Sequence, residues 1–266
     1  MKYSRKNLLS AGMFLAPSLL LAGESPITGS VAFTSDYIFR GISQTQEKPA
    51  VQAGLNYAHD SGVHFGIWGS NINFKSKDKS DAPNDNASIE LDISAGYGAS
   101  LNDSINWDLS IIHYGYPGSN LSSPDKLGFW EIVPTLSYDL KVAKITGQLA
   151  YSPNFLGAAK RATYLMLGLD MPLPGDFSLN ARIGEQWLKE DKDSRLSQTF
   201  VDANTPYIPK NYSEWKIGIA KQIAGLGLEL AYFDTTLSKD KCQATAIFGQ
   251  KDLCSPRAVF AISKNF

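Results

Sequence analysis

The sequence predicts an all-β protein, a transmembrane antiparallel up-and-down β-barrel of about twelve strands that follows a cleaved N-terminal signal peptide. Three observations predict this class: a basic and then apolar N-terminus, long segments in which apolar and polar residues alternate, and connections that are alternately short and long. No stretch of about 18 apolar residues follows the N-terminal segment, so the sequence excludes helical membrane spans.

The N-terminus has the pattern of a secretory signal peptide. Lys2, Arg5 and Lys6 precede an apolar stretch, residues 8–22, that is too short for a permanent membrane helix and ends in small residues. We therefore expect a signal peptide over residues 1–22 and one barrel domain over residues 23–266. Removing three basic residues takes the net charge from -1 to about -4, and nothing in this balance favours nucleic-acid binding.

The alternating segments are longer than the strands of most soluble proteins. Residues 88–101, SIELDISAGYGASL, alternate without an error, and a tilted strand that crosses a bilayer needs about nine to eleven residues whereas soluble strands average about five or six. The same reading predicts strands over residues 27–40, 50–58, 63–74, 88–101, 105–116, 129–140, 144–152, 162–171, 177–187, 212–222, 226–235 and 257–266.

The connections between these strands alternate in length. Turn-forming residues make short connections at 59–62, 102–104, 141–143, 172–176 and 223–227. Longer polar connections cover 42–48, 75–87, 117–128, 152–160, 188–211 and 236–256. Short periplasmic turns and long external loops are typical of barrels in the outer membrane of Gram-negative bacteria.

Aromatic residues and the chain end agree with this interpretation, because Trp and Tyr favour the two membrane interfaces. Aromatic residues fall at predicted loop ends (Phe39, Trp130, Trp187, Trp215, Tyr232) and at predicted turn ends (Tyr57, Trp107, Tyr138, Phe177, Phe266). Phe260, Ile262 and the terminal Phe266 also resemble the signal read by the barrel assembly machinery, although Lys264 departs from it. The alternative is a soluble sandwich with these aromatic residues in its core.

Three stretches carry a resemblance to a known family. SDYIFRGISQT (35–45), KPAVQAGLNY (48–57) and GIWGSNI (66–72) are similar to the TorF-like porin family, a proteobacterial group formerly described as conserved hypothetical proteins. The resemblance is dense over residues 30–74 and elsewhere is mostly one of strand pattern. It implies an outer-membrane barrel with pore activity, and it brings no substrate, cofactor or catalytic residue.

The polar faces of the strands predict the residues that line the lumen. This set contains more acidic than basic residues, which favours cations weakly: Asp36, Arg40, Glu90, Asp92, Asp108, Glu131, Asp170, Arg182, Lys216 and Glu229. We expect a narrow open channel, since no connection in the sequence has the pattern of a long loop that folds inward. The alternative is that these charges pair across the lumen and close it.

Enzymatic function has little support in the sequence. His59 and Ser61 have a spacing superficially like that of an outer-membrane lipase, but turn chemistry explains the stretch around them. No cluster has metal-ligand spacing and no cofactor motif is found. Cys242 and Cys254 are expected to form a disulfide in the last long loop. A weaker possibility is a divalent-cation or lipopolysaccharide bridge through three aspartates of one loop, Asp78, Asp81 and Asp85.

Two functional classes follow from the sequence. The first is a porin for small polar solutes or ions, with a weak cation preference and a solute that the sequence does not identify. The second is a plugged barrel whose external loops act in binding or adhesion, and a lipase-type enzyme is a remote third. The expected partners are outer-membrane lipid, lipopolysaccharide and the assembly machinery, and the sequence leaves the oligomeric state open.

Overall fold

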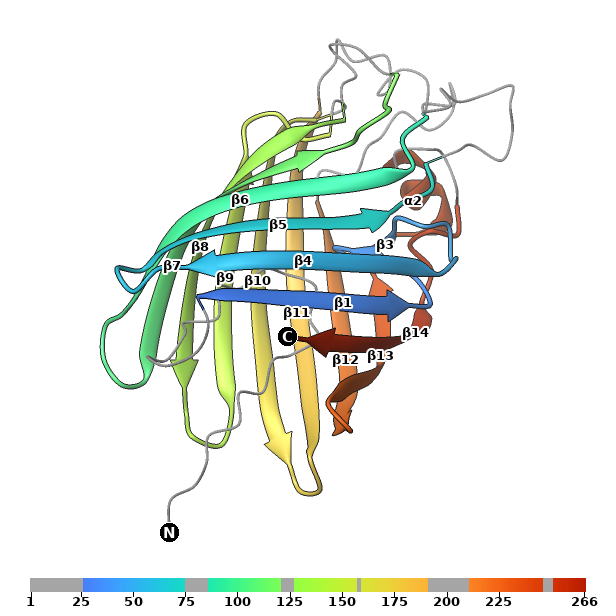
Figure 1. The fold of residues 1–266 in the computed structure, drawn as a ribbon. Helices are drawn as coiled ribbons and strands as arrows, with labels where there is room; N and C mark the ends of the chain where they lie inside the picture. The colour runs from blue at the N-terminus through green and yellow to red at the C-terminus, as the bar shows by residue number, and fades with distance from the viewer. Residues whose placement is uncertain (1–25, 75–85, 121–126, 157–158, 191–210, 246–250) are drawn as a thin grey trace.

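The computed structural model describes residues 26–74, 86–120, 127–156, 159–190, 211–245 and 251–266. In this part of the chain, twelve antiparallel strands form a closed barrel (Figure 1). The predicted signal peptide lies outside the described residues. No helix among the described residues is long and apolar enough to cross a membrane.

Strand order around the barrel follows the chain, as in an up-and-down barrel. The strands are β1 (Ile27–Thr34), β4 (Ala50–Ala58), β5 (Val63–Asn71), β6 (Ile89–Ser100), β7 (Ile105–Gly115), β8 (Phe129–Asp139), β9 (Lys144–Ser152), β10 (Ala159–Leu173), β11 (Phe177–Glu190), β12 (Asn211–Ile223), β13 (Leu226–Thr235) and β14 (Arg257–Asn265). The predicted fold class is therefore confirmed.

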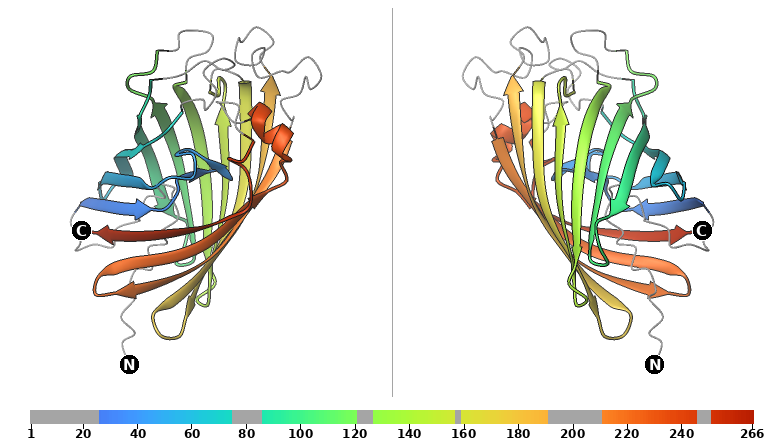
Figure 2. Two further views of the ribbon diagram at one scale, coloured as in Figure 1. Left: turned by 90° about the vertical axis from the view of Figure 1, so that its right-hand side faces the viewer. Right: turned by 90° about the vertical axis from the view of Figure 1, so that its left-hand side faces the viewer.

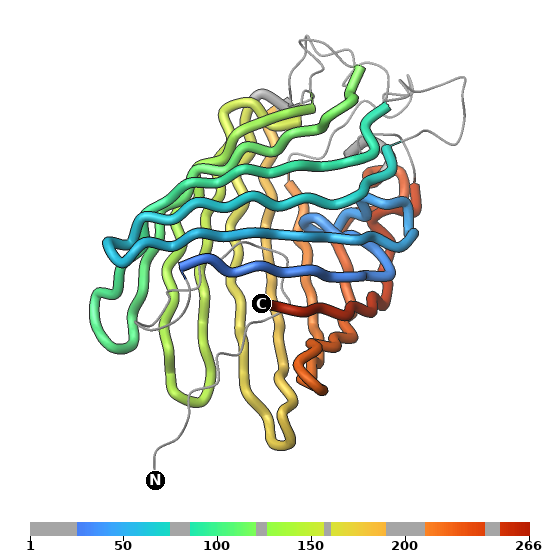
Figure 3. Tube along the Cα trace, in the orientation of Figure 1, coloured from blue at the N-terminus to red at the C-terminus, as the bar shows by residue number. Residues whose placement is uncertain are grey.

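The first and last strands close the ring. Ser30 of β1 lies opposite Asn265 of β14, and the backbones of Gly29 and Phe266 exchange two hydrogen bonds of 2.7 and 3.0 Å. Figure 3 shows the C-terminal end of the chain beside β1. Gly29 has no Cβ, which leaves room for the ring of Phe266 against its backbone. Closure removes the sheet edges that would otherwise expose unpaired backbone groups.

Every strand has an outer face and an inner face, because successive side chains point to opposite sides of a sheet. Apolar side chains face outward, for example Val51 at 58% exposure and Leu167 at 55%, while Gln52, Glu90 and Glu214 on the alternate positions are buried. Seven of the ten aromatic residues assigned to the strand ends are exposed: Trp130, Trp187, Trp215, Tyr232, Tyr57, Tyr138 and Phe266.

The prediction for the first strand was wrong at its end. Strand β1 stops at Thr34, and residues 35–49 turn into the barrel as a short hairpin of β2 (Ile38–Phe39) and β3 (Ile42–Ser43). We call residues 35–49 the plug segment. Both views in Figure 2 show its blue hairpin inside the ring of strands. Phe39 is consequently an interior residue and not an interfacial one, and residues 42–48 are not an external loop.

The helix α2 (Lys239–Thr245) lies in the last long connection, between β13 and β14. Cys242 in this helix is bonded to Cys254, with an S–S distance of 2.08 Å, which confirms the predicted disulfide. Short turns join the strands at one end of the barrel, as at residues 59–62 and 174–176. We refer to this as the turn end, and to the opposite end as the loop end.

Candidate functional site: the charged interior of the barrel

The plug segment is built around Asp36. The Oδ1 atom of Asp36 accepts hydrogen bonds from Ser43 Oγ at 2.7 Å and Thr45 Oγ1 at 2.8 Å, and its Oδ2 atom pairs with Arg257 Nη1 of β14 at 2.9 Å. Burial raises the pKa of the Asp36 carboxyl, and the hydrogen bonds from Ser43, Thr45 and Arg257 oppose this rise. Asp36 therefore holds the two arms of the segment together and fixes them to the barrel wall.

A two-residue turn forms the tip of the plug segment. Phe39 lies opposite Ile42, and Arg40 and Gly41 between them have positive φ values of 46° and 82°. Two successive positive φ values are typical of the type I′ turn, which matches the twist of a hairpin. Glycine adopts such a conformation freely, whereas arginine is strained in it. The chain therefore holds an unfavourable backbone conformation at Arg40.

The side chain of Arg40 explains this strain, because it contacts the far wall of the barrel. Its Nη2 atom donates to Glu131 Oε2 of β8 at 2.7 Å, and its Nη1 atom donates to Gln186 Oε1 of β11 at 2.9 Å. Arg40 and Glu131 are each 1% exposed. Burial alone would lower the pKa of Arg40, but the charge and hydrogen bond of Glu131, together with Tyr114 and Tyr164, outweigh it and the pKa is raised.

Aromatic and polar groups complete the seat of Arg40. The guanidinium carbon lies 4.4 Å from the ring centre of Tyr164 and 4.8 Å from that of Phe39, which are cation–π distances. Tyr212 Oη donates to the carbonyl oxygen of Arg40 at 3.1 Å, and Tyr114 Oη donates to Glu131 Oε2 at the same distance. The tip is thus held by groups from β7, β8, β10, β11 and β12.

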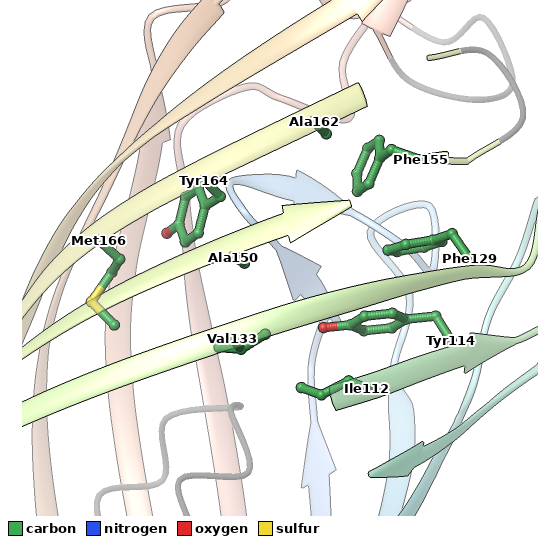
Figure 4. Packing of buried hydrophobic residues seen from close by; sticks show 9 residues of the cluster. All are labelled: Ile112, Tyr114, Phe129, Val133, Ala150, Phe155, Ala162, Tyr164 and Met166. Carbon is green, nitrogen blue, oxygen red and sulfur yellow. The ribbon is translucent and has the colours of Figure 1, made fainter. Parts of the chain in front are cut away.

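An apolar cluster lies along the wall that faces the plug segment. Figure 4 shows its nine buried residues, which come from strands β7 to β10 and from the connection after β9: Ile112, Tyr114, Phe129, Val133, Ala150, Phe155, Ala162, Tyr164 and Met166. Phe39 packs against this cluster, with its ring centre 5.8 Å from that of Tyr114. The loop half of the interior is therefore packed like a protein core.

Other charged pairs line the walls. Arg182 of β11 pairs with Glu214 of β12 at 3.1 Å, and Lys216 of β12 pairs with Glu229 of β13 at 2.6 Å. Nearer the turn end, His64 Nε2 lies 2.6 Å from Asp108 Oδ2. Two of these pairs join neighbouring strands and the third joins strands β5 and β7, so these charges pair along the wall.

Two buried carboxylates have no basic partner among the described residues. Glu90 Oε1 accepts a hydrogen bond from Tyr116 Oη at 3.3 Å, but Glu90 Oε2 and Asp92 Oδ1 have no hydrogen-bond partner. Glu90 is 1% and Asp92 5% exposed. Both lie on β6 and on the same face, because they are two residues apart. This pair therefore places two acidic side chains in the interior with no basic partner among the described residues.

The ten residues predicted to line the lumen fall into three groups. Eight of them, from Glu90 to Glu229, lie on barrel strands, and among these Glu90, Asp92, Asp108, Glu131, Lys216 and Glu229 are buried while Asp170 and Arg182 are intermediate. Asp36 and Arg40 lie in the plug segment and not on a barrel strand. Sequence reasoning missed the wall partners Gln186, Tyr164, Glu214 and Tyr212, all of which were on the polar or interior side of their strands. The Arg40-Gly41 pair between the apolar residues Phe39 and Ile42 is the signal that could have revealed the hairpin.

The candidate enzymatic pair lies elsewhere. His59 Nδ1 and Ser61 Oγ are 2.8 Å apart, in the exposed turn between β4 and β5. Within the described residues, no group of three or more His, Cys, Asp or Glu could hold a metal ion. The aspartates at 78, 81 and 85 lie outside the described residues.

A closed twelve-strand barrel with an apolar exterior and a charged interior defines the class of outer-membrane-type β-barrel proteins. Residues 22–266 match the family model described as "Bacterial protein of unknown function (Gcw_chp)", so the chain belongs to this family. This description does not include the TorF-like designation that the sequence resemblance suggests. No curated protein matches the chain.

Two solved structures have a similar fold. The chain is similar to "KdgM porin" with a TM-score of 0.52 at 4% identity, covering 90% of this chain and 98% of that one. It is similar to "NanC porin structure in rhombohedral crystal form" with a TM-score of 0.51 at 10% identity, covering 89% of this chain and 97% of that one. At these identities the similarity concerns the fold.

Proposed function

We propose that this protein is an outer-membrane porin for the passive diffusion of small polar solutes or ions, with a weak preference for cations. The proposal rests on one observation above all: charged side chains fill the interior of a closed barrel whose exterior is apolar. A lipid-facing exterior requires apolar residues, whereas a charged interior serves ions and polar solutes. The similarity in fold to two porins supports the same class.

Charge counts support the cation preference. Among the described buried residues, seven are carboxylic acids, namely Asp36, Glu90, Asp92, Asp108, Glu131, Glu214 and Glu229, and three, Arg40, Lys216 and His64, are basic. The partly buried Arg182 and Arg257 neutralise two more. Glu90 and Asp92 have no basic partner among the described residues, and carboxylates that ionise in a water-filled lumen raise the local concentration of cations.

The same excess of acidic side chains also indicates which charge the solute should carry. One of the similar structures is described as "KdgM porin in complex with disordered oligogalacturonate", at a TM-score of 0.50 and 4% identity. Oligogalacturonate carries carboxylates, and an interior with surplus carboxylates repels it. We therefore propose small cations or uncharged polar solutes for this chain.

One observation favours the second candidate function, a plugged barrel whose external loops bind a partner. The plug segment fills the loop half of the interior, where Arg40, Glu131 and Gln186 are each 1% exposed. In this second function the barrel would present the loops and conduct little.

Single-channel recording separates the two candidates. The signal-free protein is refolded, its barrel content is verified by circular dichroism, and it is inserted into a planar bilayer with a KCl gradient. Reproducible conductance steps with a reversal potential shifted toward that of K⁺ are expected for the porin. Silence from correctly folded protein would favour the second function, and a reversal potential shifted toward that of Cl⁻ would contradict the cation preference.

A further inference from the structure

We propose that the plug segment, residues 35–49, is an autoinhibitory gate: seated as in the structure it restricts the barrel, and the channel conducts fully when the tip leaves its seat. Arg40 is the latch that holds the seated state. This inference rests on the proposed porin function, and it concerns a segment that the sequence analysis assigned to a strand and an external loop.

Strand pairing shows that the barrel does not need this segment to connect β1 and β4. The two strands are antiparallel neighbours, and their last pair is Thr34 opposite Ala50. A two-residue turn suffices to join strands in this arrangement. The chain instead uses fifteen residues, 35–49, and sends them inward. The length of the segment is therefore accounted for by what it does inside the barrel.

The tip of the segment reaches strands far from its attachment. Strands β8 and β11, which carry Glu131 and Gln186, are separated from β1 by at least three strands in either direction around the ring. Gly41 lies against Glu214 of β12 and Thr235 of β13. A segment that is anchored at β1 and contacts these walls crosses the interior, so solute passing through the loop half of the barrel has to displace it.

Several features indicate that the tip of the plug segment can leave its contacts with the wall and does not fill the barrel permanently. Arg40 Nε and Glu131 Oε1 are buried without a hydrogen-bond partner, and the backbone of Arg40 is strained at a φ of 46°. Burying an ion pair also requires removing the water around both charges. Withdrawal of the tip returns water to these groups and relaxes the backbone, which offsets part of the contacts that are lost.

Withdrawal also uncovers the acidic part of the wall. Tyr37 of the plug segment is 2% exposed and packs with Trp68 at a ring-centre distance of 5.5 Å. A hydrogen bond joins the side chains of Tyr37 and Glu90. Opening therefore exposes Glu90, with Asp92 next to it on the same face, and the open state is expected to be more cation-selective than the seated state.

The first test removes the latch and then the segment. Arg40→Ala deletes the contacts with Glu131 and Gln186. A second variant replaces residues 35–49 with Asn-Gly, so that a two-residue turn joins Thr34 to Ala50. Arg161→Ala, at an exposed position of β10, is the matched arginine control. We expect a severalfold rise in single-channel conductance for the first two variants and wild-type conductance for the control.

The second test fixes the segment in place. A Cβ built on Gly41 lies 3.7 Å from the Cβ of Thr235, within the range of about 3.5–4.5 Å that disulfides require. Gly41→Cys with Thr235→Cys, oxidised, is expected to hold the conductance at the seated level, even when Arg40→Ala is added. Reductant is expected to restore the high conductance of Arg40→Ala. The two single-cysteine variants and reduced wild-type protein are the controls.

Each outcome decides the proposal. If Arg40→Ala and the Asn-Gly variant fold as barrels and conduct like wild type, the gate is wrong and the porin function stands. If the oxidised cross-link leaves the conductance of an otherwise wild-type channel unchanged and does not cancel the effect of Arg40→Ala, the gate is also wrong. If every variant is silent, including the one without residues 35–49, both the gate and the porin function are overturned.

Discussion

Two connections at the loop end of the barrel are fixed by different means. The plug segment turns inward and is held by buried ion pairs, Asp36 with Arg257 and Arg40 with Glu131. The connection between β13 and β14, residues 236–256, carries the disulfide and two ion pairs that are more than half exposed, Lys239 with Asp252 and Lys251 with Asp240. A covalent bond fixes a connection permanently, whereas ion pairs can open and re-form.

The two connections also touch each other. Ile42 of the plug segment packs against the cluster of Cys242, Leu253 and Cys254, and Ser43 N donates to the carbonyl oxygen of Leu253 at 2.9 Å. Arg257 Nη2 donates to the carbonyl oxygen of Asp252. The cross-linked connection therefore forms a support against which the plug segment packs.

The largest expected effect comes from removing the latch. While the tip stays seated, Arg40→Ala leaves Glu131 buried without its cation, and breaking one partner of a buried pair costs up to about 3–5 kcal/mol, less where withdrawal of the tip returns water to Glu131. We expect a loss of this size in the free energy of unfolding, measured by urea titration of the protein in detergent micelles with tryptophan fluorescence. Arg161→Ala should leave the value unchanged. Equal losses in the two variants would show that the plug segment is not held by Arg40.

The second-largest loss in the free energy of unfolding is expected from removing the disulfide. Replacing Cys242 and Cys254 with serine reopens a connection with a sequence separation of 12 residues, which costs up to about 3 kcal/mol in the chain-entropy model. The same urea titration measures the loss. Because Ile42 packs on this disulfide, the serine variant should also show faster hydrogen exchange in residues 42–45. Unchanged hydrogen exchange in residues 42–45 would show that the disulfide does not support the plug segment.

Selectivity is expected to change moderately when the unpaired carboxylates are neutralised. Glu90→Gln with Asp92→Asn should move the reversal potential in a KCl gradient toward zero, because these two acids have no basic partner among the described residues. Asp108→Asn is the comparison, since Asp108 is paired with His64, and its effect should be smaller. A larger shift for Asp108→Asn would show that the charge near the turn end sets the selectivity.

The smallest effect is expected at the exposed pair of the cross-linked connection. Lys251 and Asp240 are 53% and 69% exposed in their side chains, and exposed pairs contribute little because water and salt screen them. Lys251→Ala should leave both the unfolding midpoint and the conductance unchanged within error. A clear loss of stability would mean that this pair is part of the support.

Much of the barrel could be predicted from the sequence. Residues 50–58, 144–152 and 226–235 form strands with the predicted bounds, because a strand with one face to lipid and one to the interior must alternate strictly, and short turns then fix its ends. The predicted disulfide followed from an even pair of cysteines in an exported chain.

The plug segment could not be found in the same way. Tyr37 and Phe39 continue the alternation of β1, so a period of two extends past Thr34. An inward segment also needs apolar residues, here to pack against Tyr114 and Trp68, and pattern alone does not distinguish a lipid contact from an interior one. The partners of Arg40 are 91 and 146 residues away along the chain, and only the register of the closed barrel brings them together.

Closure of the barrel and seating of the plug segment share one residue. Arg257 is the first residue of β14, the strand whose pairing with β1 completes the ring, and its guanidinium holds Asp36, two residues beyond the end of β1. The contacts of the seam are therefore complete only when Asp36 lies beside Arg257, so a single ion pair couples closure of the ring to the position of the plug segment.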